Sequence, residues 1–342
     1  MQPTPSPSLR RTLTWLVISL LMANCQDHAR NPVAESACRL LTQLVSTESS
    51  TSKTETSTQN TDNADRQLTR QVILTNSTSG TTTTSSEQTN NYLYDAGGFV
   101  TTRTGQFRSI AANGTVTLST FENRYSYQNG RLISHVFETV SATGTRSTQT
   151  RTYEYDGQGA LSRFVLVQAS GQTIQTYLGG KQVDAEFVAT NGTRSKPFKF
   201  NAQGLVSEAP TLLAAVVKLT YDASNNLIRE DFFDAQGKQV GYHDHLYDLQ
   251  NKNPNAATPT LLFKGYPTVT ELTTTSFLLT PIYGPALRTN SKRYTGTTLT
   301  NEETFAYKFN PNGFPTEVTL LSKNASGVTT SQTRTSYTYQ CR

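Results

Sequence analysis

Aromatic and polar residues alternate along most of the chain with a period of two. In one recurring unit, a pair of aromatic residues two positions apart precedes Asp or Asn, a Gly- or Asn-rich turn and an apolar residue. Side chains alternate between the faces of a strand, so each pair predicts one buried aromatic face and one wet face. The paired positions, all Tyr or Phe except Leu219 and His245, are Tyr92/Tyr94, Tyr125/Tyr127, Tyr153/Tyr155, Phe198/Phe200, Leu219/Tyr221, His245/Tyr247, Tyr307/Phe309 and Tyr337/Tyr339.

A second kind of turn lies between these units. An Asn-Gly pair between alternating segments is the strongest short signal for a β-hairpin. Because no helical stretch separates the turns, the simplest topology is an antiparallel meander. The sequence therefore predicts an all-β fold, a meander of β-hairpins in one long twisted or curled sheet such as an open barrel. The second turns are Asn113-Gly114, Thr143-Gly144, Ser170-Gly171, Asn191-Gly192, Gln236-Gly237 and Ser326-Gly327.

Charged residues on the wet face indicate the register between strands. If Asp156 pairs with Leu161 across a four-residue turn, opposite charges face one another on neighbouring strands. Such pairs each contribute about 0.2–1 kcal/mol and help to fix the register. The predicted pairs are Glu154 with Arg163, Lys218 with Asp231, and Arg229 with Asp244.

Two stretches depart from the repeat. Residues 46–66 are almost wholly Ser, Thr, Asn, Gln and charged, which predicts a tether or mobile loop because little apolar area is available to offset ordering. Just before it, residues 33–45 carry apolar side chains at a spacing that fits one short N-terminal helix, and a strand paired with the C-terminus is the alternative. The β-hairpin repeat domain is accordingly predicted over residues 67–342.

Prolines interrupt the repeat over residues 249–290. Proline is excluded from central strands, so this segment is predicted as a long excursion from the sheet. Long ordered loops are often functional, and a protein or glycan partner is expected to bind here. The prolines are Pro254, Pro259, Pro267, Pro281 and Pro285.

The N-terminus carries the features of an export signal. Arg10-Arg11 precede an apolar stretch from Leu13 to Met22, which is too short to span a bilayer as a helix. Residues 21–25 resemble a bacterial lipobox that ends at Cys25, although Met22 and Asn24 depart from its usual residues. This predicts a signal peptide over 1–24 and, over 25–66, an N-terminal segment and tether anchored by a lipid on Cys25. Ordinary signal-peptidase cleavage, which would leave Cys25 as a thiol, is the alternative.

The two other cysteines, Cys38 and Cys341, lie near opposite ends of the exported chain. In an oxidising compartment an even pair of cysteines predicts a disulfide. The bridge would close a loop of about 300 residues and would stabilise the fold by up to about 5 kcal/mol. A thiolate nucleophile, the alternative, needs a basic neighbourhood, and Cys38 has only Arg39 beside it.

The densest group of ionisable residues contains one candidate site. His243 and His245 project from one face of a strand, and the predicted register sets Glu230 opposite His243 on that face. Two imidazoles and a carboxylate are ligands of zinc and other divalent ions. The competing interpretation is that His245 merely replaces the aromatic residue of its unit. We therefore predict no catalytic residue, metal or cofactor, with Glu230, His243 and His245 as candidates for binding.

The repeated units also resemble a known family. The Tyr-x-Tyr-Asp turns, together with residues 312–315 and 337–341, are similar to the YD or RHS repeat, and the chain from about residue 90 to 342 looks like bacterial lipoproteins with a C-terminal hairpin array. For RHS proteins the likeness would imply a hairpin shell around a cargo. This chain has too few units to enclose one and lacks the core-type Asp-Pro-x-Gly segment, so only an RHS-like hairpin architecture carries over.

Composition narrows the expected function. The net charge is +5, but the basic residues are spread thinly, which excludes a clustered nucleic-acid footprint. We expect an exported protein of the bacterial cell envelope, lipid-anchored most readily to the outer membrane, with its body in the periplasm or at the cell surface. Its predicted role is a non-enzymatic structural or binding scaffold. A glycan-active or metal-dependent hydrolase that uses Glu230, His243 and His245 is the alternative.

Overall fold

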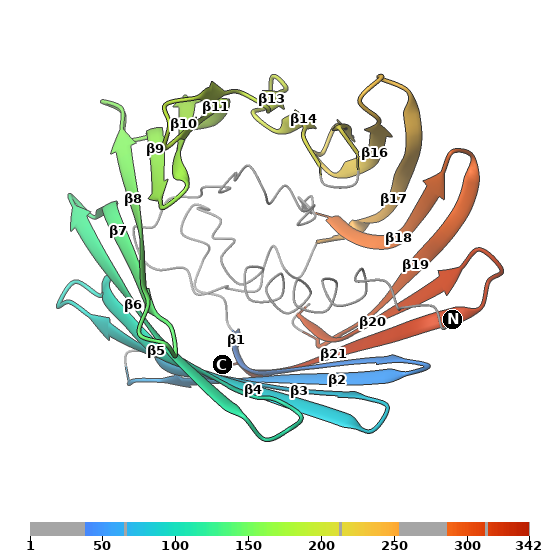
Figure 1. Cartoon of the computed structure of the whole chain (residues 1–342), viewed down its shortest axis with the longest axis horizontal. Coiled ribbons are helices and arrows are strands. Elements are labelled where there is room, and N and C mark those ends of the chain that lie inside the picture. The colour runs from blue at the N-terminus through green and yellow to red at the C-terminus, as the bar shows by residue number, and fades with distance from the viewer. Residues whose placement is uncertain (1–37, 65–66, 212–213, 253–285, 312–313, 342) are drawn as a thin grey trace, which may run out of the picture.

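The protein folds as a single antiparallel β-sheet (Figure 1). The computed structural model describes residues 38–64, 67–211, 214–252, 286–311 and 314–341, and within these ranges it contains strands and no helix. The predicted all-β meander is therefore confirmed. The strands are β1 (Cys38–Ser49), β2 (Ser52–Asp62), β3 (Leu68–Ser79), β4 (Thr82–Tyr94), β5 (Val100–Ile110), β6 (Val116–Gln128), β7 (Arg131–Val140), β8 (Arg146–Tyr155), β9 (Leu161–Gln168), β10 (Gly171–Leu178), β11 (Lys181–Ala189), β12 (Arg194–Ser195), β13 (Lys199–Phe200), β14 (Val206–Ala209), β15 (Val216–Tyr221), β16 (Leu227–Phe233), β17 (Gln239–Lys252), β18 (Ala286–Thr295), β19 (Thr298–Phe309), β20 (Pro315–Asn324) and β21 (Thr329–Cys341).

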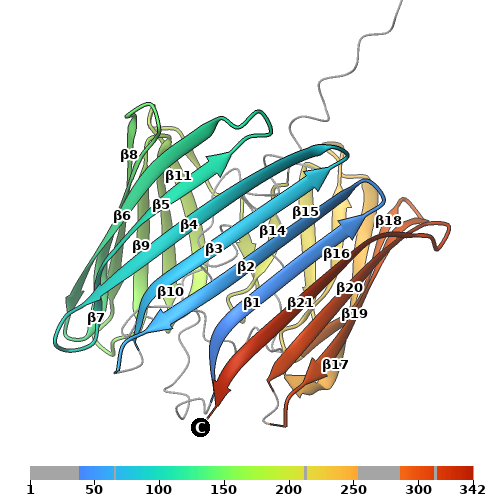
Figure 2. The same cartoon turned by 90° about the horizontal axis from the view of Figure 1, so that it is seen from below.

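Apart from β12 and β13, strands that follow one another in sequence are paired, and the first strand also pairs with the last. Figure 2 shows β1 between β2 and β21, and both pairings are antiparallel. The segment 33–45 was expected to form a short helix, but from Cys38 onward it is strand β1. The alternative, a strand paired with the C-terminus, is confirmed. The β1–β21 pairing is favoured over a helix because it gives both edges of the meander a hydrogen-bonding partner.

The series of paired strands is open at one point, between β12 and β13. β12 pairs with β11, and β13 pairs with β14, so the two short strands face different neighbours. Pro197 lies between them and has no backbone N–H with which to continue a ladder. Strands alternate in direction along a meander. An antiparallel pairing of β1 with β21 therefore requires β12 and β13 to act as two halves of one interrupted strand.

The Ser- and Thr-rich stretch at 46–66 is not a tether over the part that the structure describes. It forms the end of β1 and all of β2, so the hairpin domain includes strands before residue 67, the first of which is β1 in the described part of the chain. The segment lacks apolar side chains, but its backbone is bonded on both sides and its hydroxyls bond across strands. The cross-strand hydroxyl distances are 2.9 Å for Thr47–Thr333, 2.9 Å for Thr54–Ser77 and 3.0 Å for Thr56–Thr75.

The break in the sheet is shorter at both ends than the predicted excursion at 249–290. β17 continues to Lys252 and β18 begins at Ala286, so residues 249–252 and 286–290 belong to the sheet. Residues 253–285, which contain the five prolines, lie outside the described part of the chain.

The two faces of the sheet differ as the alternation predicts. Tyr92 is 3% exposed, whereas Leu93 beside it is 62% exposed. The residue between the two aromatic positions is exposed in every unit, even where it is leucine. The aromatic face holds two apolar clusters, one centred on Tyr92, Tyr125, Tyr153 and Phe164, the other on Phe187, Phe198, Leu219 and Phe232.

In five units a tyrosine hydroxyl forms a hydrogen bond with the backbone of the preceding strand. Each of these hydroxyls donates to a backbone carbonyl near the start of the preceding strand, at 2.8 Å in every case. In four units the tyrosine is the second residue of the pair, and this hydrogen bond accounts for Tyr rather than Phe there; in the fifth the donor is Tyr307, the first residue of its pair. The pairs are Tyr94 to Leu68, Tyr155 to Leu132, Tyr221 to Val206, Tyr247 to Leu227 and Tyr307 to Arg288.

Removing one of these hydroxyls should weaken the fold measurably. We expect Tyr155→Phe to lower the free energy of unfolding by about 1 kcal/mol, because the ring stays packed while the Leu132 carbonyl loses its donor. Urea unfolding would measure the change. Tyr242→Phe is the matched control, since the Tyr242 ring lies on the wet face, stacked on Tyr294 at 4.3 Å. Equal losses in the two variants would contradict a structural role for the hydroxyl bond.

Most turns of the two kinds share one backbone geometry. The Asp156 N–H donates to the Ala160 carbonyl and the Gly159 N–H donates to the Asp156 carbonyl, both at 2.9 Å. The turn at Ala111 repeats this pattern through Gly114. Gly159 has φ +83° and Gly114 has φ +80°, values that side chains other than glycine rarely adopt. In the first kind, the carboxylate or amide oxygen of the leading Asp or Asn also accepts backbone N–H groups within the turn.

The turn between β8 and β9 shifts the predicted partner of Leu161 but leaves the predicted pairing of Glu154 with Arg163 in place. Leu161 lies opposite Tyr155 rather than Asp156, and a register shift follows at once. Because the shift absorbs one residue, Glu154 still lies opposite Arg163, as predicted. Their side chains form an ion pair at 2.7 Å on the wet face.

Candidate functional site

Strands β16 and β17 bring the three candidate residues together on the aromatic face. Glu230 lies directly opposite His243 in the ladder, as predicted. Nδ1 of His243 is 2.7 Å from Oε2 of Glu230, and Nε2 of His245 is 3.5 Å from Oε1. Each carboxylate oxygen therefore faces a different imidazole.

This cluster is buried and its carboxylate is held in the ionised form. Glu230 is 3% exposed and His245 is 6% exposed. Burial acts to raise the pKa of Glu230, but the hydrogen bonds and charges of His243 and His245 together outweigh it and lower that pKa to about 2. Burial, and then the charge on Glu230, also raises the pKa of the nearby Tyr221 hydroxyl. The negative charge of Glu230 is thus stabilised from two sides.

Ring packing shows what His245 replaces. The His243 ring lies 4.7 Å from the Phe232 ring and 6.5 Å from the His245 ring, with its edge toward the latter. His245 occupies the first aromatic position of its unit, and Nδ1 of its buried ring has no hydrogen-bond partner. Over the described ranges, no three His, Cys, Asp or Glu side chains are arranged to hold a metal ion. The geometry is that of a buried ion network within an aromatic row.

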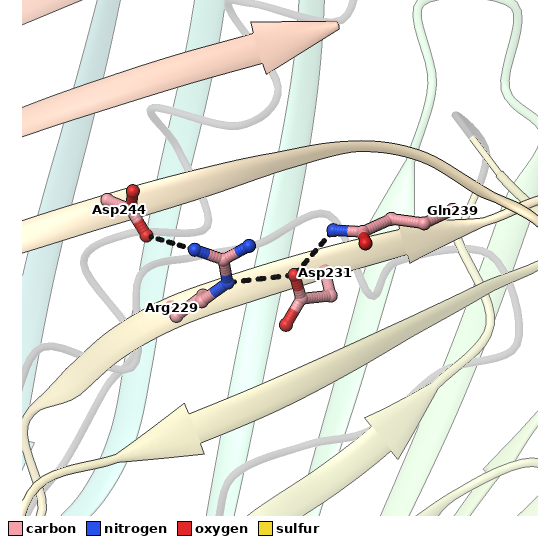
Figure 3. Close-up of polar contacts among 4 residues, drawn as sticks. All are labelled: Arg229, Asp231, Gln239 and Asp244. Atoms are coloured by element: carbon pink, nitrogen blue, oxygen red, sulfur yellow. Dashed lines mark hydrogen bonds and ion pairs between the residues drawn. The ribbon is translucent and has the colours of Figure 1, made fainter. Parts of the chain in front are cut away.

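The opposite face of the same strands carries a separate charge network (Figure 3). Arg229 donates to Asp231 through Nε at 2.8 Å and to Asp244 through Nη1 at 3.1 Å. Gln239 also donates to Asp231, at 2.7 Å. The predicted Arg229–Asp244 pair is confirmed. Successive residues of β16 thus belong to networks on opposite sides of the sheet.

One predicted charge pair is only partly correct. Lys218 and Asp231 do lie opposite one another in the ladder. The Asp231 carboxylate is bound instead by Arg229 of its own strand, and the Lys218 ammonium lies 4.7 Å from the centre of the Phe233 ring. A guanidinium two residues away on the same face is the nearer donor, so register alone did not identify the partner.

A second polar cluster on the aromatic face was missed by the sequence analysis. Asn90 is fully buried and accepts a hydrogen bond from Arg103 at 3.1 Å. The His135 ring stacks on Tyr125 at 4.5 Å, and its Nε2 lies 2.7 Å from Oδ1 of Asn123. These residues form a row of polar side chains beside the aromatic row across β4 to β7.

His135 is held neutral in this row. Burial, followed by the positive charges of Arg151 and Arg103, lowers its pKa to about 3. Because the Asn123 oxygen can only accept, Nε2 of the neutral ring donates to it. Its partner Asn123 lies on the neighbouring strand β6, so the two residues are not close in sequence.

The repeated unit contains a further polar position, which could have indicated Asn90 and Asn123 from the sequence. Two residues before its aromatic pair, each unit has one more position of the same parity, and in six of the eight units the residue there is polar. The residues are Asn90, Asn123, Arg151, Lys196, His243 and Thr335. His243 is therefore one member of a repeated polar position rather than an isolated ligand.

The remaining predicted site residues are cysteines. Cys25 lies outside the described residues. Cys38 lies opposite Cys341 in the β1–β21 ladder. The Pro-containing segment expected to bind a partner falls mostly within residues 253–285, which the structure does not describe.

Comparisons with known proteins give little guidance. No family model matches the chain, and no curated protein matches it. The fold is similar to that in a crystal structure of a porin-like protein from Bacteroides uniformis, with 12% identity and a TM-score of 0.37 over 88% of this chain and 96% of the other. A TM-score at this level carries no argument about function. In the described part of the chain, no helix is both long and apolar enough to cross a membrane.

Proposed function

We propose that this protein is exported to the bacterial cell envelope, held to a membrane by a lipid on Cys25, and acts there as a non-enzymatic structural or binding scaffold. The observation that supports this role is the charge on the exposed face of the sheet. That face carries ion pairs on strands along most of the meander, and they include Glu48–Lys53, Glu138–Arg146, Glu154–Arg163, Glu186–Arg194, Glu208–Lys199, Asp244–Arg229 and Glu317–Lys308.

Such a face suits water rather than hydrocarbon. Charged side chains facing lipid destabilise a membrane protein by several kcal/mol each near the bilayer midplane. Exposed pairs in water carry no such penalty and contribute about 0–1 kcal/mol. Attachment to a membrane would therefore lie outside the sheet, and the leader that ends at Cys25 offers a lipid anchor.

The buried cluster favours a scaffold over a hydrolase. A general base or metal ligand needs a carboxylate that can reach substrate or ion. Glu230 is 3% exposed, and both of its oxygens face imidazoles of its own sheet. A protein or glycan partner is proposed to bind at the Pro-containing segment between β17 and β18. The similarity to YD and RHS repeats extends to hairpin architecture alone.

The anchor can be tested by fractionation and mass. We expect the intact protein from membranes to carry the added mass of acyl chains, and Cys25→Ser to lack it. A chain whose residues 1–25 are replaced by a leader that ordinary signal peptidase cleaves should appear in the soluble fraction. Cys38→Ser, with Cys25 retained, should stay with the membrane. The proposal would fail if the leader-swapped chain remained in membranes after a carbonate wash, or if the native protein carried no lipid.

A further inference from the structure

We infer that Cys38 and Cys341 form a disulfide that covalently joins the first and last strands of the sheet. The register of these strands carries this inference, since it sets the two residues opposite one another at the end of the β1–β21 ladder. Only the supply of an oxidant in the cell rests on the proposed export. The pairing of the two residues does not depend on it.

Backbone geometry allows the bond without movement of the strands. Directly opposed residues in an antiparallel pair have Cα atoms about 4.5–5.5 Å apart. Disulfides join Cα atoms about 4.4–6.8 Å apart, so this spacing lies within the permitted range. Side chains at opposed positions also project to the same face. The next pair inward, Arg39 with Gln340, keeps the same register, and the nearest shift in this ladder lies between Leu40 and Thr42.

The position of this bridge gives it a large effect on the unfolded chain. Every other ladder joins strands that are neighbours in sequence, whereas β1 and β21 lie at opposite ends of the sheet domain. Their pairing must therefore overcome the largest loop-closure entropy in the fold. A covalent link between Cys38 and Cys341 removes most of that entropy from the unfolded state.

The chemistry is a thiol–disulfide exchange. The two thiols lose two protons and two electrons as the sulfur–sulfur bond forms. The disulfide of an oxidant, either a thiol oxidoreductase or oxidised glutathione, accepts both electrons and both protons and becomes two thiols. An oxidising compartment supplies such a partner.

The test uses the full exported chain with Cys25→Ser, so that only two thiols remain. The protein is unfolded, reduced and then refolded with mixed oxidised and reduced glutathione. We expect no free thiol by alkylation and mass measurement, two after reduction, and a linked peptide containing Cys38 and Cys341. The reduced protein and the Cys38→Ser variant should both show a Tm lower by roughly 5–10 °C.

A register-shifted pair provides the matched control. Combining Gln340→Cys with Cys341→Ser moves one thiol a single place along β21, where it faces Arg39. This pair should stay reduced in a buffer that oxidises the native pair. The inference is overturned if the native thiols stay free after refolding, or if the shifted pair oxidises as readily. Because the assay is done in vitro, either result leaves the proposed export and lipid anchor to their own test.

Discussion

Glu230→Ala is expected to lower the free energy of unfolding by about 3–5 kcal/mol, the range for removing one partner of a buried ion pair. The substitution removes the carboxylate that faces His243 and His245, at 2.7 and 3.5 Å, and leaves one buried and one largely buried imidazole without it. It also opens a cavity beside Phe232, whose ring packs on His243. Guanidinium chloride unfolding at pH 7 measures the loss.

Asp231→Ala is the matched control for this experiment. Asp231 is the next residue in β16 but lies on the wet face, where it binds Arg229 and Gln239. Removing this partly exposed carboxylate should reduce the free energy of unfolding by only about 0–1 kcal/mol, because water replaces its partners. If the two variants lost the same stability, the contrast between the faces of β16 would be wrong. If Glu230→Ala were as stable as the native protein, the cluster would not be a structural network.

The hairpin architecture could be predicted because its determinants are local. The spacing of Tyr153 and Tyr155 fixes the buried face, and Gly159 fixes the turn that follows them. The sequence does not decide between a helix and a strand at residues 33–45, because the partner of that strand lies near the other end of the chain. Composition predicts a tether over residues 46–66, yet this polar segment joins the sheet through Asp62 because its strands are bonded on both edges. Composition describes what a segment can bury, and it does not describe which strands lie beside it.

In the candidate site, too, contacts could be predicted only where the register of a single hairpin determines them. The register placed Glu230 opposite His243 correctly, because both residues lie within one hairpin. His135 is harder to predict because Tyr125 lies directly opposite it, and its hydrogen-bond partner Asn123 lies two residues further along the neighbouring strand. Aligning the repeat two residues further toward the N-terminus would have exposed the shared polar position.

Mild acid is expected to destabilise the protein through His135. Its pKa is about 3 when folded and 6.5 as an ordinary side chain, so the unfolded chain binds the proton more readily. The stability contributed by the neutral ring is fully present above pH 6.5 and is lost as the pH falls toward 3. At 1.36 kcal/mol per pKa unit, the loss amounts to about 3 kcal/mol by pH 4. Unfolding by denaturant at successive pH values measures this slope.

His135→Gln separates this effect from other acid-sensitive groups. Glutamine keeps a donor for the Asn123 oxygen but does not titrate, so stability should fall less between pH 7 and 4 than in the native protein. Glu230→Gln should instead flatten the profile only below about pH 4.5. The pKa of Glu230 is lowered from 4.5 to about 2, so its contribution is present above 4.5 and is lost below it. A His135→Gln profile as steep as the native one between pH 7 and 4 would show that protonation of this buried ring does not control acid unfolding.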